Sequence, residues 1–206
     1  MRRVTCFFEL SRRAGQRFDS EHGVTTEALI FLGELDPEAI GPSIDHATHY
    51  EPTPLASIDA LLDAVPPRFE RMTFVDIGSG MGRVVFVAAR RPFRAIVGVE
   101  ISPALHAVAT QNRSRWSDPR QRCRDVRLVC RDALDFRFPR GDLVVYFYNP
   151  FDTVVMEAVT GELALDRGRD VTLLYNTPTA RAAIEATGAF RLVAELPEGV
   201  VYRLLR

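Results

Sequence analysis

An apolar run that ends beside an acidic residue and three closely spaced glycines limits what this chain can fold into. Residues 72–77 are mostly apolar and include Asp76, and Gly78, Gly80 and Gly82 follow at alternate positions. A continuous apolar run of this length is typical of a strand buried on both faces, as in parallel sheets. Glycines adopt positive φ and let the backbone pass close to a ligand. The pattern predicts a buried strand that feeds a tight, ligand-approaching turn.

Strand and helix patterns alternate from this point to the C-terminus. The predicted strands are residues 72–77, 95–100, 126–130, 142–148, 171–175, 190–195 and 200–205, and the predicted helices are 83–90, 102–116, one after Asp152 and one from 177 to 188. The last two strands are joined by a turn too short for a crossover, so they form an antiparallel hairpin. We therefore expect an α/β fold: a doubly wound, mostly parallel seven-stranded sheet with an antiparallel C-terminal hairpin, in a three-layer αβα sandwich.

The first 71 residues do not follow this alternation, because glycines and prolines interrupt them. Residues 27–32 are expected to form a short helix. Residues 54–65 carry apolar side chains at helical spacing, which predicts an amphipathic helix packed on the sheet. We expect residues 1–53 to form an N-terminal cap segment on a domain of residues 54–206.

Acidic residues at the strand ends indicate the kind of ligand. A dinucleotide fingerprint has the spacing G-x-G-x-x-G, whereas the third glycine here comes one residue early. Asp76 stands just before the turn, where it would repel a phosphate and attract a cation. Glu100, at the end of the second strand, is placed to accept both hydroxyls of a ribose. Asp132 and Ala133 follow the third strand, beside the expected edge of an adenine.

A nucleoside with a cationic tail satisfies these features, and S-adenosylmethionine (SAM) is such a molecule. Ile101 and Leu134 would then flank its adenine. Two other interpretations remain. The glycines and acids could serve only packing and capping, or the ligand could be a nicotinamide or another nucleotide, as in an oxidoreductase.

The same residues resemble a known family. Residues 74–83 resemble motif I of class I (seven-stranded Rossmann-like) SAM-dependent methyltransferases, residues 97–100 the acidic motif that follows, and residues 142–151 motif IV. The resemblance covers roughly residues 50–206 and makes 54–206 the SAM-binding methyltransferase domain. It implies that the cofactor is held by Asp76, Gly78, Ser79, Gly80, Gly82, Glu100, Ile101, Asp132, Ala133 and Asn149.

Two details are similar to the non-SET histone lysine methyltransferases and to related bacterial stand-alone proteins. One is the form of motif I, and the other is the upstream segment Tyr50-Glu51-Pro52-Thr53. In that family the matching loop folds over the methionine part of SAM. The resemblance implies that Tyr50, Glu51 and Thr53 line the cofactor pocket. The chain has no nucleosome-binding basic tail and no lysine, so a histone substrate is not implied.

Tyr148-Asn149-Pro150-Phe151 resembles the N-P-P-Y/F motif of amino-group methyltransferases, with one proline in place of two. The resemblance implies that Asn149, Pro150 and Phe151, together with Tyr50, orient the acceptor at the transfer site, and it favours N-methylation over O-methylation. The alternative is a strand-ending turn with Phe151 in the core.

The pair His46 and His49, near acidic residues, leaves three roles open. It could bind a metal, supply a general base, or simply line the rim of the cap, and the last is favoured. We predict no metal site. The arginines between positions 113 and 131 are expected to form a solvated face rather than a phosphate or RNA site.

Composition narrows the remaining choices. The formal net charge of −1 argues against nucleic acid binding driven by bulk charge, and no apolar run is long enough to span a bilayer. The N-terminus lacks the core of a signal peptide, so we expect a cytoplasmic protein. The predicted function is SAM-dependent methyl transfer to an amine or hydroxyl of a small molecule or peptide, with residues 1–53 setting specificity. The alternative is a non-catalytic SAM-binding regulatory or partner protein. The oligomeric state stays open, a homodimer included.

Overall fold

The computed structural model describes residues 2–206, with side chains from residue 9 onward. Its seven strands form one sheet in the order β3-β2-β1-β4-β5-β7-β6. The strands are β1 (Met72–Ile77), β2 (Ala95–Glu100), β3 (Val126–Cys130), β4 (Asp142–Tyr148), β5 (Val171–Asn176), β6 (Phe190–Leu196) and β7 (Gly199–Leu204). Strands β1 to β5 are parallel, and β7 is antiparallel to both β5 and β6. The predicted doubly wound sheet and its reversed last strand are confirmed.

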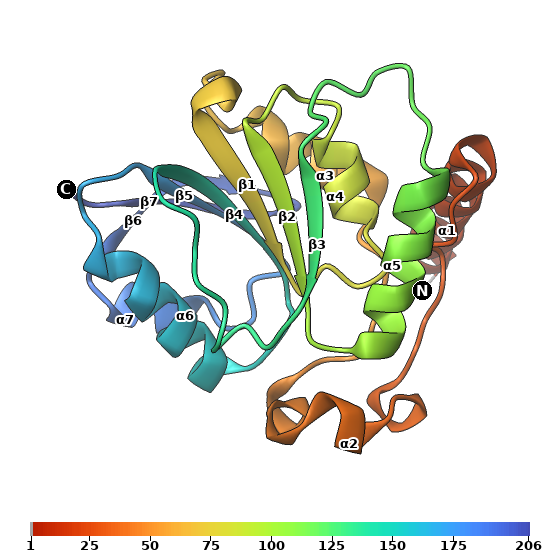
Figure 1. Ribbon diagram of the computed structural model, residues 1–206, viewed down its shortest axis with the longest axis horizontal. Coiled ribbons are helices and arrows are strands. Elements are labelled where there is room, and N and C mark those ends of the chain that lie inside the picture. Colours follow the sequence, from red (N-terminus) through yellow and green to blue (C-terminus); the bar gives the residue numbers. More distant parts are fainter. Residues whose placement is uncertain (1) are drawn as a thin grey trace.

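Helices cover both faces of the sheet, which completes the three predicted layers (Figure 1). The helices are α1 (Arg2–His22), α2 (Pro37–Ile40), α3 (Leu55–Asp63), α4 (Arg83–Ala88), α5 (Pro103–Arg115), α6 (Thr153–Leu165) and α7 (Arg181–Ala186), with 3-10 turns η1 (Leu32–Glu34), η2 (Pro42–His46) and η3 (Phe69–Arg71). Within residues 2–206, no helix combines the length and hydropathy that crossing a bilayer requires.

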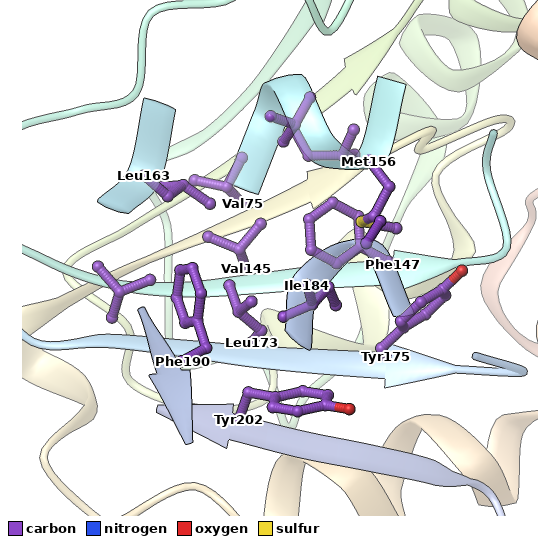
Figure 2. Close-up of a cluster of buried hydrophobic side chains, with 14 of the residues drawn as sticks. Val75, Val145, Phe147, Met156, Leu163, Leu173, Tyr175, Ile184, Phe190 and Tyr202 are labelled. Carbon is purple, nitrogen blue, oxygen red and sulfur yellow. The ribbon is translucent and has the colours of Figure 1, made fainter. Parts of the chain in front are cut away.

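Successive side chains of a strand point to opposite faces, so one sheet supplies two cores. Val75 and Val145 face α6 and α7, where they meet Met156 and Ile184 in the cluster of Figure 2. The neighbouring Phe74 faces the other side and packs in a second cluster with side chains of α1, α3 and α4. Burial of this many apolar side chains, at about 1.5–3 kcal/mol each, provides most of the driving force for folding.

Three local predictions were wrong or incomplete. Residues 2–22 form a long helix that the sequence patterns did not predict, because few of its described side chains, those of residues 9–22, are buried and exposed Arg–Glu pairs occupy its outer side. Residues 27–31 are not helical, and Leu32 only begins the 3-10 turn η1, since Ile30 pairs with Tyr50 in an antiparallel bridge. Helix α7 begins at residue 181 rather than 177, because Thr177 adopts a left-handed φ of 49° that no helix can contain.

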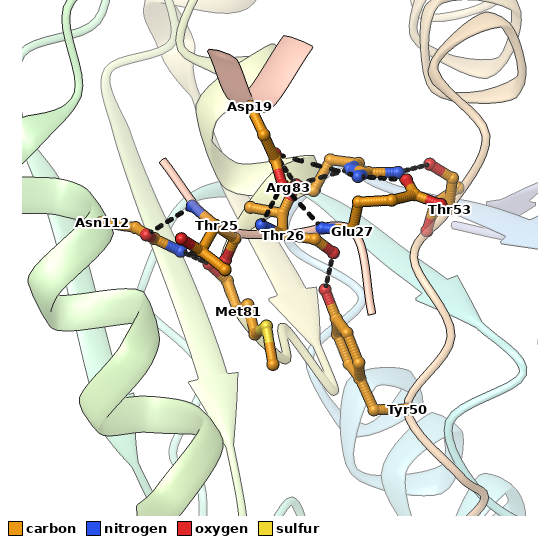
Figure 3. Close-up of polar contacts among 9 residues, drawn as sticks. All are labelled: Asp19, Thr25, Thr26, Glu27, Tyr50, Thr53, Met81, Arg83 and Asn112. Atoms are coloured by element: carbon orange, nitrogen blue, oxygen red, sulfur yellow. Dashed lines mark hydrogen bonds and ion pairs between the residues drawn. The ribbon is translucent and has the colours of Figure 1, made fainter. Parts of the chain in front are cut away.

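A network of buried polar contacts joins the N-terminal segment to the sheet domain (Figure 3). Arg83, the first residue of α4, pairs with the Glu27 carboxylate at 2.6 Å and donates to Thr26 Oγ1 at 2.8 Å. On the other side, Asp19 of α1 accepts the backbone N–H groups of Thr26 and Glu27 at 2.6 and 2.8 Å. Asn112 of α5 exchanges two hydrogen bonds with the backbone of Thr25. Residues 25–27 are therefore held from three helices at once.

Gly15 of α1 gives a test of this network. A Cβ at this position would overlap the Glu27 carboxylate and lie 2.8 Å from Arg83 Nη2. Alanine normally favours a helix over glycine by about 1 kcal/mol. We expect Gly15→Ala to lower the free energy of unfolding instead, by about 1–3 kcal/mol, because it displaces a buried ion pair. Urea denaturation of the purified protein measures the change.

The matched control is Gly161 of α6, where a Cβ would meet nothing within 4 Å. We expect Gly161→Ala to stabilise the protein by about 0.5–1 kcal/mol. Equal stabilisation by both substitutions would show that Gly15 does not make room for the ion pair.

Candidate functional site

A cavity lies at the carboxyl ends of β1, β2 and β4, where the order of the strands reverses. Open α/β sheets bind their ligands at such a switch point. Residues 32–53, which we call the roof, cross these strand ends and close the cavity from outside (Figure 1). The cavity contains about 1030 Å³ of space, part of it open to solvent.

The glycine turn between β1 and α4 forms the floor of the cavity. Gly78 and Gly80 have φ values of 79° and 51°, in the left-handed region that other residues rarely adopt. A Cβ on Gly78 would lie 2.7 Å from Pro150, and one on Gly80 would overlap the ring of Tyr50. Both positions require glycine for conformation and for space. Gly82, with φ of 93°, caps α4 and does not line the cavity.

Two buried carboxylates meet beside this turn. Glu100, at the end of β2, accepts the N–H of Gly80 at 2.7 Å through Oε2 and the N–H of Ser102 at 2.9 Å through Oε1. Asp76 is equally buried, and its Oδ2 has no hydrogen-bond partner among the described residues. Ser79 Oγ is buried without a described partner as well. Buried polar atoms rarely stay unpaired, so these two are available to a ligand.

Burial raises the pKa of Asp76 well above its ordinary value, and the charge of Glu100 raises it further. Burial also raises the pKa of Glu100, although the hydrogen bonds from Ser102 and Gly80 offset part of that effect. A cationic ligand would lower the pKa of both carboxyl groups, because a positive charge nearby favours their ionised forms. The site is therefore best suited to a ligand that carries a positive charge.

Three of the four residues that the sequence assigns to the adenine line the cavity. Ile101, Asp132 and Ala133 line the cavity beyond β2 and β3. Leu134 does not line it and is 42% exposed, since Asp132 Oδ1 accepts the Leu134 N–H at 2.9 Å and turns the chain outward. Leu105 of α5 provides an apolar wall that the sequence did not suggest.

Tyr50, Glu51 and Thr53 all line the cavity from the roof. The Tyr50 ring lies on Gly80, and its hydroxyl donates to the carbonyl of Thr26 at 2.7 Å. The network of Figure 3 therefore positions Tyr50 as well. Burial raises the pKa of Tyr50, so the hydroxyl stays a donor at neutral pH.

Pro150 and Phe151 line the cavity, but Asn149 does not. Asn149 has a left-handed φ of 39°, and its side-chain Oδ1 accepts a hydrogen bond from Thr179. Thr48 of the roof donates its side-chain hydroxyl to the Asn149 carbonyl at 2.6 Å and its N–H to the Pro150 carbonyl at 3.2 Å. Phe151 is buried in the core beside Phe147. The acceptors that an amine would use at this motif are thus engaged by the chain itself.

The two histidines of the roof point to different partners. His46 Nδ1 lies 2.8 Å from Asp152 Oδ2, and this hydrogen bond raises the pKa of His46. His49 lines the cavity, with Nε2 at 3.8 Å from Glu51 Oε2. Among the residues whose side chains are described, no group of three or more His, Cys, Asp or Glu is arranged to hold a metal ion. Of the two histidines, His49 is the one placed to exchange a proton with a ligand.

Two contributors to the site were not predicted from the sequence. Arg83 borders the cavity, and its position directly after the glycine turn could have indicated this. Four aliphatic residues of the roof also line the cavity: Leu32, Leu35, Ile40 and Ile44. Their irregular spacing follows neither a helix nor a strand pattern. In the basic stretch, Arg131 lines the mouth of the cavity, whereas Arg120 and Arg127 pair with acidic neighbours.

Comparisons with known proteins agree with this geometry. A protein-family model described as a methyltransferase domain matches residues 74–164. No curated protein sequence matches significantly. An RNA methyltransferase from Salinibacter ruber, solved in complex with S-adenosylhomocysteine (SAH), is 23% identical with a TM-score of 0.53, covering 74% of this chain and 92% of that one.

Two further structures share the fold. One is a predicted N6-adenine-specific DNA methylase from Listeria monocytogenes, 14% identical with a TM-score of 0.57, covering 75% of this chain and 51% of that one. The other is a ribosomal protein L11 methylase from Lactobacillus delbrueckii, 14% identical with a TM-score of 0.50, covering 73% and 76%. These likenesses confirm the Rossmann-like methyltransferase fold. The narrower similarity to non-SET histone lysine methyltransferases stays a prediction.

SAM is the cofactor of class I methyltransferases, and the residues present fit it. The unpartnered Asp76 Oδ2 and Ser79 Oγ can accept or donate hydrogen bonds, and Gly78 and Ser79 bring the backbone of the turn to the cavity. Each oxygen of Glu100 accepts one backbone N–H and keeps a second lone pair.

Asp76→Asn tests the electrostatic description of the ligand-free site. Because the pKa of Asp76 is raised in the folded state, the unfolded chain loses its proton first as pH rises from about 4. The carboxyl therefore destabilises the folded protein increasingly through this window. We expect Asp76→Asn to raise the free energy of unfolding by about 1–2 kcal/mol at pH 8 and to change it little at pH 4. Urea denaturation at the two pH values measures this.

Asp118→Asn is the control of opposite sign. Burial alone would raise the pKa of Asp118, but hydrogen bonds from Arg120 and Arg90 outweigh it and lower the pKa. This carboxylate stabilises the folded state at neutral pH, so its removal should cost about 3 kcal/mol there. A loss of stability at pH 8 in Asp76→Asn as well would contradict the proposed strain at Asp76.

Proposed function

We propose that this chain, whose residues 74–164 form a methyltransferase domain on the class I fold, binds SAM and transfers its methyl group to an amine or hydroxyl. The observation that supports this best is the pairing of two buried carboxylates with the glycine turn. Asp76 lines the cavity and has an oxygen without a hydrogen-bond partner among the described residues, and Glu100 lies at the end of the next strand. A ligand with a cationic end and a ribose satisfies both.

Each part of the cofactor has a candidate partner in this arrangement. Glu100 accepts the ribose hydroxyls with its two remaining lone pairs, and Asp76 and Ser79 face the amino-acid end. Ile101, Asp132 and Ala133 border the adenine. When bound, SAM supplies an electrophilic methyl group on a sulfonium. The protein must then position an acceptor, keep out water and remove one proton.

We propose His49 as the group that removes this proton. The acceptor oxygen or nitrogen forms a bond to the methyl carbon while the carbon–sulfur bond breaks, its electron pair staying on sulfur to give neutral SAH. The proton of the acceptor passes to His49, which faces the cavity with Glu51 nearby to stabilise its charged form. His46 is engaged by Asp152 and is not available for this role.

His49 can accept a proton from an amine or from a hydroxyl, so its proposed role does not favour one acceptor over the other. Selection of an amine by Asn149 and Pro150 would first require Thr48 to release their carbonyls. A small molecule or an extended peptide remains the proposed acceptor. The alternative, a non-catalytic SAM-binding protein, predicts cofactor binding without turnover, so binding and SAH release must be measured separately.

Glu100→Gln tests the cofactor site. Calorimetric titration of the unchanged protein should show binding of SAM and SAH. Loss of the carboxylate removes two charge-assisted hydrogen bonds to the ribose, so we expect both ligands to bind about 100-fold more weakly. Glu162→Gln, an exposed position on α6, is the control and should bind as the unchanged protein does. An unchanged protein that binds neither SAM nor SAH would refute the proposed function.

His49→Gln tests the proton acceptor. With a panel of phenols and primary amines, SAH release from SAM should fall about 10²–10⁴-fold in His49→Gln, the usual contribution of a general base. SAM binding should persist. His46→Gln, on the same roof, should retain most of the turnover. Equal losses in the two variants would indicate a structural effect of the roof instead.

A further inference from the structure

The inner face of the roof is apolar, and it faces the cavity rather than a core. Leu32, Leu35, Ile40 and Ile44 all line the cavity. None of them belongs to either of the two hydrophobic clusters that pack against the sheet. Aliphatic side chains held beside a cavity lower the free energy only when another apolar surface covers them. No cluster of the described hydrophobic core covers them, so an apolar ligand surface is the partner that they suit.

The lining of the cavity combines two kinds of chemistry. The carboxylates of the proposed cofactor site stand at the ends of β1 and β2, and further polar groups follow β3. The roof contributes the four aliphatic side chains, and the segment after β4, which the roof contacts through Ala47 and Thr48, adds Pro150, Phe151 and Val155. We call this mainly apolar part of the lining the half under the roof. The polar residues that accompany it in the lining are Ser43, Thr48, His49, Glu51 and Tyr148.

The roof is attached on both sides, which limits what can enter. On one side Ile30 and Tyr50 exchange two backbone hydrogen bonds of 3.0 and 2.9 Å. On the other, Thr48 N–H donates to Pro150 O at 3.2 Å, and Asp152 N–H donates to His46 O at 3.0 Å. A helix or a nucleic acid duplex is about 10 Å wide or more and would have to break these contacts. A small molecule would not.

We infer that the half of the cavity under the roof is the acceptor compartment, and that it takes a small molecule with a compact hydrocarbon body and one hydroxyl or amine. This inference rests on the proposed function. The hydrocarbon body lies against Leu35, Ile40 and Ile44, and the reactive group reaches His49. The four aliphatic residues of the roof thereby determine specificity, whereas the carboxylates of β1 and β2 hold the cofactor.

The test uses 2-naphthol, a fluorescent molecule with an apolar body and one weakly acidic hydroxyl. It is titrated into the full-length protein with SAH at saturation, and its fluorescence reports binding. We expect saturable 1:1 binding of 2-naphthol that SAH does not displace. Ile44→Asp should weaken this binding at least 10-fold while leaving the affinity for SAH unchanged. Ile44→Trp, which fills the compartment without adding charge, should weaken it as well.

Leu165→Asp is the matched control, because Leu165 is 84% exposed on α6 and does not line the cavity. It should bind 2-naphthol as the unchanged protein does. Displacement of 2-naphthol by SAH would overturn the inference, since it would place both molecules in one compartment. Absence of binding to the SAH-loaded protein, or equal weakening by Leu165→Asp, would overturn it too. Failure of SAH itself to bind would instead contradict the proposed function.

Discussion

The buried guanidinium of Arg83 connects the parts of this molecule that must stay in register. It directly follows the glycine turn, so its position is fixed by the same backbone that forms the floor of the cavity. Its contacts with Thr26 and Glu27 fix the segment whose carbonyl anchors Tyr50. A buried charge is costly unless it is fully paired, and leaving it unpaired costs more than the pair contributes. The contacts of Arg83 therefore fix the position of the N-terminal segment around Thr26 and Glu27. Through the hydrogen bond from Tyr50 to Thr26, they also fix the position of the roof.

The cavity is electrostatically less favourable for its buried side chains than the two hydrophobic cores around it are for theirs. Asp76 and Glu100 are both buried in the lining of the cavity, and neither forms an ion pair with a described residue. The pKa of each carboxyl group is raised. Groups whose pKa is shifted in this way cluster at functional sites, where a protein loses some folding stability in order to hold a charged group ready for its ligand. A cationic cofactor would remove the repulsion between Asp76 and Glu100. The free energy released on relieving it would contribute to binding, which couples cofactor affinity to the strain of the ligand-free state.

The sequence predicted the sheet, and it indicated residues at the strand ends that line the cavity, because these signals are local. Glycines at alternate positions, an acid before them and an acid at the end of the next strand are each visible in a short window. The sequence also indicated a cap of residues 1–53 with Tyr50 to Thr53 at the pocket, but it did not predict the path of the roof, since residues 27–50 depend on contacts with distant segments. Ile30 is extended because it pairs with Tyr50, and Thr48 engages the Asn149 and Pro150 carbonyls from about 100 positions away. The sequence reveals the motif Asn149-Pro150-Phe151. It does not reveal that Thr48 already donates hydrogen bonds to the carbonyl groups of Asn149 and Pro150.

The strand ends and the roof, which both line the cavity, come from different stretches of the chain, and this limits what the comparisons can say. The carboxylates, the glycine turn and the adenine side lie within residues 74–164, the part that matches the methyltransferase domain. The aliphatic residues of the roof lie at positions 32–44, before that match begins. Structural relatives named as methyltransferases of RNA, DNA or protein share the fold of this chain. The acceptors of these relatives therefore carry no information about the roof. The proposed specificity rests on the roof's own residues: four aliphatic side chains and one histidine. Its two backbone attachments leave room for a small molecule.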